Sequence, residues 1–424
     1  MTEINVGDAR VVFGDCRDVL KTLPDNSVDS IVTDPPYELG FMGKKWDSTG
    51  IAYDVTVWEE CLRVLKPGGH ILSFGGSRTW HRMAVAIEDA GFELRDSIAW
   101  MYGSGFPKSL DVGKAIQKAS GVKHVDAIEN VGGGFYGENS GWNPTPRQLI
   151  MPELEGKAKE WKGWGTALKP AFEPIFVGRK PFAKGATVAQ NVLEWGVGGL
   201  NIDASRVGSR ENEPQKRPAS ASGVGNGGVA YGTRDGVVTA YTEGRWPANV
   251  ILDEFSAEIL DEQSGVSTSK RQTLTSTPGE IYGNGAGMPA HTGVYGHNDS
   301  GGASRFFYCA KASKRDRHEG LEDLAKKENA GSYQFREDGS LDGKPTQPRQ
   351  NFHPTVKPTE LMRYLIKLVT PAGGLVLDPF TGSGSTGKAA LLDGYKFVGA
   401  ELTEEYLPII EGRLKWAQDQ NTGD

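Results

Sequence analysis

Short apolar runs alternate with helical patterns over the first part of the chain. Residues 28–33 are a candidate for a buried strand. Apolar residues then recur at helical spacing over 55–65, and Pro67-Gly68-Gly69 ends this helix before the next apolar run at 70–74. This order of strand, helix and strand predicts parallel βα units up to about residue 181.

The same pattern returns near His353 and continues from there. It predicts helices over 360–369, 385–392 and 404–416, and strands over 375–377 and 397–400. Two strands are too few for a doubly wound sheet, and so are the strands of the N-terminal part by themselves. We therefore predict a single three-layer α/β/α fold, with a doubly wound, mostly parallel sheet assembled from both ends of the chain.

The region between about residues 182 and 350 differs in residue composition and periodicity. Glycine, serine, threonine and asparagine cluster there, above all over 223–236 and 279–302, which predicts long surface loops or, alternatively, a disordered linker. Large aromatic residues indicate a small packed core within it: Trp195, Trp246, Phe306 and Phe307. We expect residues 1–181 and 351–424 to form one domain, from which 182–350 emerges as an insertion.

Composition narrows the class of protein. The chain has 424 residues, of which 38% are hydrophobic and 24% charged, as in ordinary globular proteins. No apolar stretch approaches the roughly 20 residues that cross a bilayer, and residues 1–10 lack the features of a signal peptide. Cys16, Cys61 and Cys309 show neither an even number nor C-x-x-C spacing, which argues against a disulfide framework and against a zinc site. We expect a cytoplasmic protein with reduced thiols.

The charge distribution does not decide whether the protein binds nucleic acid. A formal net charge of −7 argues against a protein that coats nucleic acid nonspecifically, although it allows a local basic face. The densest basic stretch covers 305–317, with aromatic residues at 306–308. Such a stretch can bind phosphates and stack bases, but it is as often a solvated surface. Both interpretations stay open.

A glycine-rich segment follows the strand predicted at 375–377. It reads Asp378-Pro379-Phe380-Thr381-Gly382-Ser383-Gly384-Ser385-Thr386 and lies where the strand ends and a helix begins. Glycines let a backbone approach a ligand closely, and a helix N-terminus offers free N–H groups. A nucleotide-like ligand is expected, and a purely structural turn is the alternative.

Two further residues narrow the nature of that ligand. Residues 382–388 fit most of a phosphate-binding loop, but Ala389 stands where such a loop needs a hydroxyl after its lysine. The next predicted strand ends at Glu401, and a carboxylate at that place suits the hydroxyls of a ribose. An adenosine-type cofactor therefore fits better than a nucleoside triphosphate.

A second candidate site, Asp34-Pro35-Pro36-Tyr37, directly follows the strand predicted at 28–33. The two prolines stiffen the turn and remove two N–H donors, so the carbonyls around Pro35 stay free to accept hydrogen bonds. The exocyclic amine of adenine or cytosine is a poor nucleophile, because its lone pair is delocalised into the ring. Two acceptors, the Asp34 carboxylate and the Pro35 carbonyl, can hold both amine hydrogens and turn the lone pair toward a methyl donor, while Tyr37 stacks on the base. A rigid turn with a helix cap is the alternative.

Taken together, the two motifs resemble those of the DNA amino-methyltransferase family, in the permuted subgroup in which the target-base motif precedes the cofactor loop. The residues that carry the resemblance beyond the two motifs are Gly14-Asp15-Cys16, Leu65-Lys66-Pro67-Gly68-Gly69, Phe74-Gly75-Gly76 and His353-Pro354-Thr355-Val356-Lys357-Pro358. Residues 173–177 resemble the family's last, antiparallel strand, and 244–249 resemble phage and prophage methylases. The resemblance covers both ends of the chain and implies a permuted methyltransferase fold.

The resemblance also implies roles for individual residues. Asp34, Pro35, Pro36 and Tyr37 would form the catalytic turn. The cofactor S-adenosyl-L-methionine would lie against Asp378, Pro379, Phe380, Gly382, Ser383 and Gly384. Glu401 would bind its ribose, Asp15 and Cys16 would lie by its adenine, and Thr355 and Lys357 near its methionine end. Because the sequence predicts no strand after Glu401, the strand before Gly14 must lie next to it in the sheet. No metal is needed.

The resemblance implies a site-specific methyltransferase that flips adenine out of double-stranded DNA and methylates N6, with residues 182–350 recognising the target sequence. Adenine is favoured over N4 of cytosine because the family's adenine enzymes usually begin this turn with aspartate, as Asp34 does. The alternatives are methylation of RNA or of a protein amide, and a catalytically silent DNA-binding protein. No membrane partner is expected. Whether the protein forms a homodimer, and whether a restriction endonuclease accompanies it, stays open.

Overall fold

The structure is a computed structural model of the chain. It describes residues 2–39, 45–103, 109–120, 127–130, 147–150, 154–208, 224–225, 229–230, 244–270, 272–275, 292–295, 299–311, 315–327, 334–335, 341–342 and 348–421. Two compact units contain them. One unit comprises Met1–Gly103 and Phe172–Asp424, and the other comprises Ser104–Ala171.

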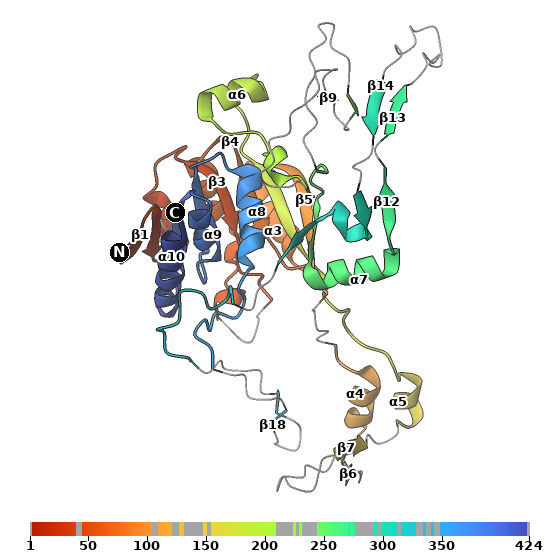
Figure 1. Ribbon diagram of the computed structural model, residues 1–424. Coiled ribbons are helices and arrows are strands. Elements are labelled where there is room, and N and C mark those ends of the chain that lie inside the picture. The colour runs from red at the N-terminus through yellow and green to blue at the C-terminus, as the bar shows by residue number, and fades with distance from the viewer. Residues whose placement is uncertain are drawn as a thin grey trace, which may run out of the picture. The chain divides into compact units, whose positions relative to one another are not determined.

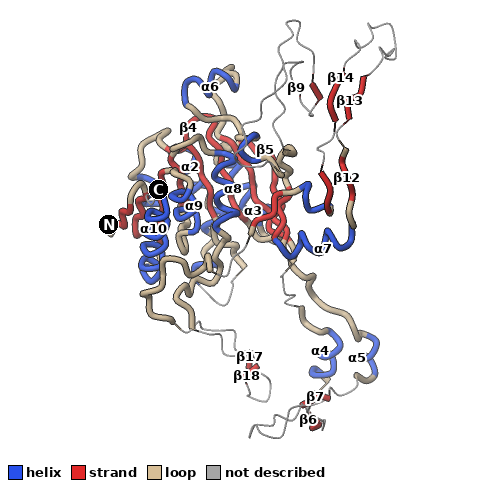
Figure 2. The backbone as a smooth tube through the Cα atoms, in the orientation of Figure 1, coloured by secondary structure: helices blue, strands red, loops and turns tan. Residues whose placement is uncertain are grey.

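The larger unit is built on one ten-stranded sheet, in the order β1-β2-β20-β19-β3-β4-β8-β5-β11-β16 (Figures 1 and 2). In that order the strands are Glu3–Val6, Ala9–Phe13, Lys396–Glu401, Leu375–Asp378, Val28–Thr33, Leu65–Phe74, Phe172–Arg179, Glu93–Met101, Val250–Asp253 and Tyr308–Ala310. The strands from β2 to β4 are parallel, β8 is antiparallel to both β4 and β5, and β5, β11 and β16 are parallel again. The sheet is therefore assembled from both ends of the chain, as the sequence predicts.

Two details of this sheet confirm expectations from the family resemblance. The strand at 173–177 is antiparallel to both of its neighbours. The strand before Gly14 pairs in parallel with β20, with Phe13 opposite Glu401.

Helices cover both faces of the sheet, so the fold is the predicted three-layer α/β/α arrangement. On one face α1 (Cys16–Lys21), α2 (Val55–Val64) and α3 (Trp80–Asp89) share a buried apolar cluster with the strands. On the other face a second cluster joins the strands to α8 (Thr359–Val369), α9 (Ser385–Leu392) and α10 (Leu407–Asn421).

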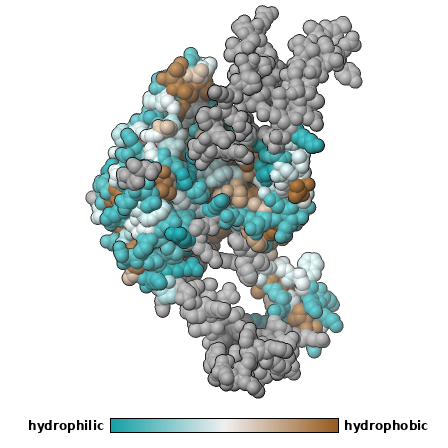
Figure 3. Space-filling model, viewed as in Figure 1, coloured by the Kyte–Doolittle hydropathy of each residue, from teal (hydrophilic) through white to brown (hydrophobic). Residues whose placement is uncertain are grey.

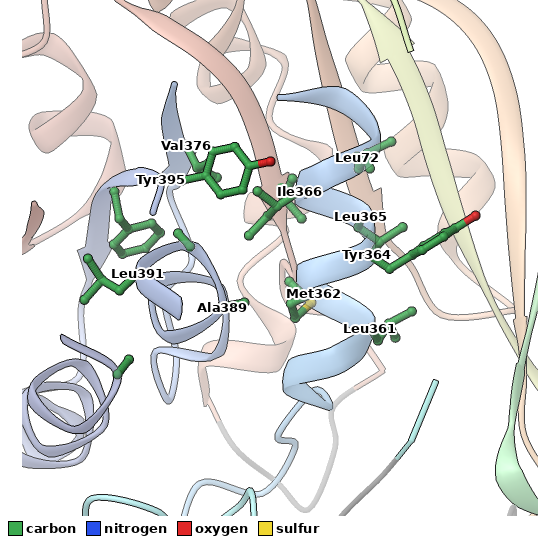
Figure 4. Packing of buried hydrophobic residues seen from close by; sticks show 14 of the residues in the cluster. Leu72, Leu361, Met362, Tyr364, Leu365, Ile366, Val376, Ala389, Leu391 and Tyr395 are labelled. Carbon is green, nitrogen blue, oxygen red and sulfur yellow. The ribbon is translucent and has the colours of Figure 1, made fainter. Parts of the chain in front are cut away.

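The core around α8 shows why its sequence forms a helix here. Leu361, Leu365 and Ile366 recur at helical spacing and are fully buried. Figure 4 shows them in one cluster with Leu72 of β4 and Val376 of β19. This apolar face anchors α8 against the strands that carry the two motifs.

The remaining elements of the larger unit come mostly from residues 182–350. They are α6 (Val188–Trp195), α7 (Glu254–Ser264) and the strand pairs β9 (Val224–Gly225) with β10 (Val229–Ala230), β12 (Ser267–Ser269) with β15 (Asp299–Gly301), β13 (Gln272–Thr275) with β14 (Thr292–Tyr295), and β17 (Gln334–Phe335) with β18 (Leu341–Asp342). Short 3₁₀ helices cover Lys45–Ser48, Ile51–Tyr53, Asp203–Ser205, Ala303–Phe306 and Glu404–Tyr406. Much of the glycine-rich sequence over 223–236 and 279–302 lies outside the described residues.

The structure divides the chain differently from the sequence prediction in two places. First, β11 and β16 lie within residues 182–350 but extend the main sheet next to β5, so this region does not simply emerge from the sheet. Second, residues 104–171, which the sequence assigns to the N-terminal part of the sheet domain, form the smaller unit. That unit contains α4 (Val112–Ala119), α5 (Gly156–Glu160) and the antiparallel strands β6 (Ala127–Asn130) and β7 (Arg147–Ile150).

The visible surface is mixed, apart from an apolar patch over α6 (Figure 3). Val188, Val192 and Leu193 are exposed there. Within the described ranges, no helix is both long enough and apolar enough to span a bilayer.

Candidate active site

The residues singled out by the sequence meet at one edge of the sheet. Asp15, Glu401, Asp378 and Asp34 stand at the carboxyl ends of β2, β20, β19 and β3, which are consecutive neighbours in the sheet. From β19 the chain continues toward one side of the sheet, to β20, whereas from β3 it continues toward the other, to β4. Such a reversal opens a crevice at the strand ends, and ligands of doubly wound folds bind there.

The glycine-rich turn after β19 has the conformation that a close ligand contact requires. Gly382 and Gly384 adopt φ values of 56° and 77°, which residues with a side chain rarely tolerate. A Cβ atom on Gly382 would lie 3.1 Å from Nε2 of His353. Helix α9 begins directly after Gly384, and in the described part of the chain no side chain caps it. Its first N–H groups are therefore available to a ligand.

Asp378 holds this turn in place. Its Oδ1 accepts hydrogen bonds from Thr33 Oγ1 at 2.6 Å and from the Phe380 N–H at 3.0 Å, and its Oδ2 accepts one from Thr386 Oγ1 at 2.5 Å. Burial raises the pKa of Asp378 to about 6, against the effect of these donors. Pro379 is buried, and the Phe380 ring packs 6.2 Å from that of Trp58. These contacts give the residues a structural task in addition to the predicted cofactor role.

Helix α10 also holds the glycine-rich loop in place. Ser383 is buried, and its carbonyl oxygen and hydroxyl accept hydrogen bonds from Nη1 of Arg413 on α10 at 2.9 and 3.0 Å. Glu401 closes the other side, because its Oε2 accepts from the Gly382 N–H at 2.7 Å and its Oε1 from the Thr403 N–H at 2.7 Å. Burial raises the pKa of Glu401 to about 7. Each of its oxygens keeps a further lone pair for a hydroxyl group.

Asp15 and Cys16 stand one strand further along this edge. Asp15 caps α1 through the Arg17 N–H at 2.9 Å and forms an ion pair with the Arg17 guanidinium, which lowers the pKa of Asp15. Cys16 packs in the apolar core, and burial raises the pKa of its thiol to about 12. The thiol is therefore uncharged and acts as an apolar core group.

At the end of β3, the Asp34 carboxylate has two different oxygens. Oδ2 lies 2.7 Å from Nζ of Lys357, whereas Oδ1 is buried and has no hydrogen-bond partner among the described residues. A buried carboxylate oxygen without a donor is costly, so its presence indicates a site built to receive one. Pro35 is buried and Pro36 partly so, which keeps the turn rigid.

Glu173, near the start of β8, belongs to the same cluster. Its Oε2 accepts the Tyr37 hydroxyl hydrogen at 2.8 Å and lies 3.3 Å from Nζ of Lys357. Nζ also donates to the Tyr37 hydroxyl oxygen at 3.1 Å. Sequence reasoning missed Glu173, although it stands at the start of the segment that resembles the family's antiparallel strand.

Aromatic side chains surround this cluster. Nζ of Lys357 lies 4.9 Å from the ring centroid of Phe74, which in turn makes an edge contact with Trp100. Trp100 packs against Tyr102 and stands directly opposite Glu173 in the pairing of β5 with β8. Such a wall offers flat apolar surface beside the polar groups.

The segment that supplies Lys357 is held by its own histidine. His353 is buried, its Nδ1 lies 2.6 Å from the Thr355 carbonyl oxygen, and burial lowers its pKa to about 3. The imidazole is therefore neutral. Thr355 itself is exposed. Lys357, two residues after Thr355, forms an ion pair with Asp34 and not with the glycine loop.

Two alternative interpretations of the sequence lose support. Lys388, the lysine of the possible phosphate loop, is fully buried, with Nζ 2.7 Å from Asp316 Oδ1 and 2.8 Å from Glu319 Oε2. It is therefore engaged in a structural ion-pair cluster.

In the basic stretch 305–317, Arg305 donates to the carbonyls of Gly301 and Gly302, and Arg317 to those of Asn351 and His353. Both arginines thus support loops of this unit. Lys314, another member of the stretch, lies outside the described residues.

Comparison with known proteins gives a consistent result. A family model for N6/N4 methyltransferases, described as "DNA methylase", matches residues 28–412. The type II methyltransferase M.HindIII of Haemophilus influenzae is 29% identical over 143 residues, which are 34% of this chain and 36% of that protein. The type II methyltransferase M2.DpnII of Streptococcus pneumoniae is 37% identical over 116 residues, 27% of this chain and 42% of that protein. Both matches span less than half the length of these relatives.

A comparison with solved structures found PvuII DNA methyltransferase (cytosine-N4-specific), with 12% identity, a TM-score of 0.41 and coverage of 96% of this chain and 87% of that one. The complex of M1.HpyAVI with SAM has 14% identity and a TM-score of 0.36, with coverage of 96% and 99%.

Proposed function

The chain belongs to the DNA methylase family of N6/N4 methyltransferases, and from this we propose that it transfers the methyl group of S-adenosyl-L-methionine to N6 of adenine in duplex DNA. The target adenine is flipped out of the helix into the site at Asp34. Residues 182–350 provide recognition of the DNA sequence.

One observation carries this proposal: the buried Oδ1 of Asp34, which lacks a donor, stands at the sheet edge beside the glycine loop. An exocyclic amine supplies the missing donor. Its two hydrogens are held by Oδ1 and by the Pro35 carbonyl, so the nitrogen lone pair turns away from the ring and toward the methyl donor. Lys357 fixes the other oxygen of the Asp34 carboxylate.

The residues at the strand ends fit S-adenosyl-L-methionine. The backbone around Gly382 and Gly384 and the uncapped start of α9 would hold it, and Glu401 would accept hydrogens from its ribose hydroxyls. Asp34, Asp378 and Glu401 make this edge rich in carboxylates, which suits a ligand with a cationic sulfonium. When bound, the cofactor supplies an electrophilic methyl group.

Flipping a base costs a few kcal/mol, and stacking on an aromatic ring returns about 1–3 kcal/mol. Tyr37 is the ring in this proposal, because its hydroxyl is held by Glu173 and its backbone carbonyl by Thr79 Oγ1 at 2.8 Å. Gly76 makes room for it, since a Cβ there would lie 3.2 Å from the Tyr37 ring. A fixed ring loses little entropy on binding a base.

The test is methyl transfer from labelled S-adenosyl-L-methionine to duplex DNA, RNA and protein side by side, followed by mass spectrometry of the nucleosides. We expect labelled N6-methyladenine from duplex DNA alone. N4-methylcytosine as the sole product would overturn the choice of adenine and leave the chemistry of Asp34 unchanged. Transfer only to RNA or protein would overturn the choice of substrate, and no transfer to any of them would contradict the proposed activity.

A further inference from the structure

Glu173 lies outside both sequence motifs, yet it completes the cluster around Asp34. It comes from β8, whereas Asp34 and Tyr37 follow β3, and Lys357 precedes α8. Its Oε2 accepts the Tyr37 hydroxyl hydrogen and faces Nζ of Lys357. The carboxylates of Asp34 and Glu173 are each 19% exposed in their side chains, and Lys357 is 8% exposed.

The second carboxylate changes the charge of the site. Asp34 and Lys357 alone would form a neutral pair, but with Glu173 the three groups carry a net charge of −1 when all are ionised. Burial by itself would lower the pKa of Lys357, but the two carboxylates outweigh it and raise that pKa. The lysine thus stays protonated, and one negative charge remains over.

This surplus charge lies where methyl transfer occurs. The amine nitrogen held by Asp34 must come within about 3–3.5 Å of the methyl carbon, in line with the sulfur. The sulfur therefore comes within several ångströms of the cluster. Before transfer it is a cationic sulfonium, and afterwards it is the neutral thioether of S-adenosylhomocysteine. A unit charge at such a distance in a partly buried site changes an affinity by roughly tenfold or more.

We propose that Glu173 is a positioning residue that sets the charge of the target-base site, so that the site prefers the cationic methyl donor over its neutral thioether product. Glu173 also holds the Tyr37 hydroxyl and the Lys357 ammonium in place around Asp34. The inference rests on the proposed methyl transfer and deepens it, because it assigns product release to the loss of this attraction.

Two substitutions separate charge from geometry. Glu173→Gln keeps the length of the side chain and removes its charge, whereas Glu173→Asp keeps the charge and shortens the side chain. Calorimetry without DNA measures the affinities for S-adenosyl-L-methionine and S-adenosylhomocysteine, and the ratio of the two is the readout. We expect the glutamine variant to lose roughly tenfold of the wild-type preference for the methyl donor, and the aspartate variant to keep it within about threefold.

A control removes a matched carboxylate of β5 that faces the far end of β8. Glu93 pairs with Arg179 at 2.6 Å, and Arg179 stands six residues along the strand from Glu173, roughly 20 Å away. Glu93→Gln should leave the ratio unchanged. If Glu173→Gln does not fold, Glu173→Met supplies the neutral side chain, and the same loss is expected.

An unchanged ratio in a folded neutral variant overturns the inference, as does an equal loss in the Glu173→Asp variant. A wild-type protein that binds neither compound would instead contradict the proposed function itself. The two failures are therefore distinguishable.

Discussion

Thr33 donates its hydroxyl hydrogen to Oδ1 of Asp378 over 2.6 Å and so joins two residues that are 345 positions apart in the chain. Thr33 is the last residue of β3, directly before the Asp34 turn, and Asp378 is the last residue of β19, directly before the glycine loop. Both side chains are buried. The bond thus ties the proposed target-base site to the proposed cofactor site.

We expect Thr33→Val to weaken both sites, because valine fills the same volume but offers no donor. The loss of a hydrogen bond to a buried charged group should lower the free energy of unfolding by about 1–3 kcal/mol. Denaturant unfolding and calorimetry with S-adenosyl-L-methionine measure the two effects. Thr33→Ser keeps the hydroxyl and should stay close to wild type. If the valine and serine variants have the same stability and the same affinity, the hydrogen bond does not connect the two sites.

Asp34→Ala tests the target-base site. We expect methyl transfer to duplex DNA to fall by at least roughly 100-fold, because one of two acceptors for the amine is gone. Affinity for S-adenosyl-L-methionine should persist, since the glycine loop is untouched. Asp54→Ala is a matched change away from the site, where Asp54 caps α2 by accepting from the N–H and the hydroxyl of Thr56. It should lose some stability but no activity. Near wild-type transfer by Asp34→Ala would show that the role is wrong.

Gly384→Val tests the cofactor loop. The new side chain strains a backbone at φ 77°, and its Cβ would lie 3.4 Å from Cα of Ile410 on α10, so the loop must shift and affinity should fall by roughly 10- to 100-fold. Gly394 supplies the control, because it has a similar φ of 72° and open space around it. Gly394→Val therefore introduces the same strain without the obstruction. If both variants bind S-adenosyl-L-methionine equally well, the loop does not hold it.

Much of this arrangement can be predicted from the sequence, because it depends on residues that are close together in the chain. Helix α9 follows the predicted bounds, 385–392, because glycines precede it and apolar residues continue through it. Asp34 and Asp378 could be placed at one edge because both follow buried strands. In contrast, the pairing of Lys357 with Asp34 spans 323 positions, and no local pattern reports it.

Other features of the structure leave too weak a pattern in the sequence to be predicted from it. A glutamate near the start of a strand is common, so nothing in the sequence distinguishes Glu173 until β8 packs between β4 and β5. Strands β11 and β16 have four and three residues, too few for a periodicity argument to detect them. The division of the chain between recognition and catalysis therefore stays a prediction.

Glu401 should make cofactor binding depend on pH. Its pKa is raised to about 7 by burial, so the carboxylate that would accept the ribose hydrogens is protonated in acid. We expect affinity for S-adenosyl-L-methionine to fall below pH 7, approaching tenfold per pH unit. The sign for stability is opposite, because a raised pKa favours folding below the ordinary glutamate pKa of 4.5, and this contribution disappears as pH rises through about 7.

Calorimetry between pH 5.5 and 8.5 checks this dependence. The Glu401→Gln variant should bind S-adenosyl-L-methionine weakly, and its affinity should change less steeply with pH. The pH dependence that remains in this variant reports the ionisation of the ligand and of Asp378. Identical slopes for the variant and the wild type would remove Glu401 from the site.

The recognition role of residues 182–350 can be tested without disturbing the main sheet. Removal of the whole region would delete β11 and β16, which belong to that sheet. The structure offers a smaller excision, because Val207 and Arg245 form an antiparallel bridge through hydrogen bonds of 3.0 and 2.8 Å. A short glycine turn can therefore replace 209–243, most of which lies outside the described residues.

We expect this excision to leave the unfolding temperature and the affinity for S-adenosyl-L-methionine unchanged but to lower site-specific methylation of duplex DNA by at least roughly tenfold. The excised segment begins and ends beside a surface suited to nucleic acid: the Arg206 guanidinium lies 5.5 Å from the ring centroid of Trp246, and Trp246 is 57% exposed. We therefore expect the segment to contact DNA together with these two residues. Lys327 and Arg349 form a second such bridge, so replacing 329–347 in the same way is a matched control that should keep specificity. Unchanged site preference after the first excision, measured by sequencing methylated DNA, would place recognition outside 209–243.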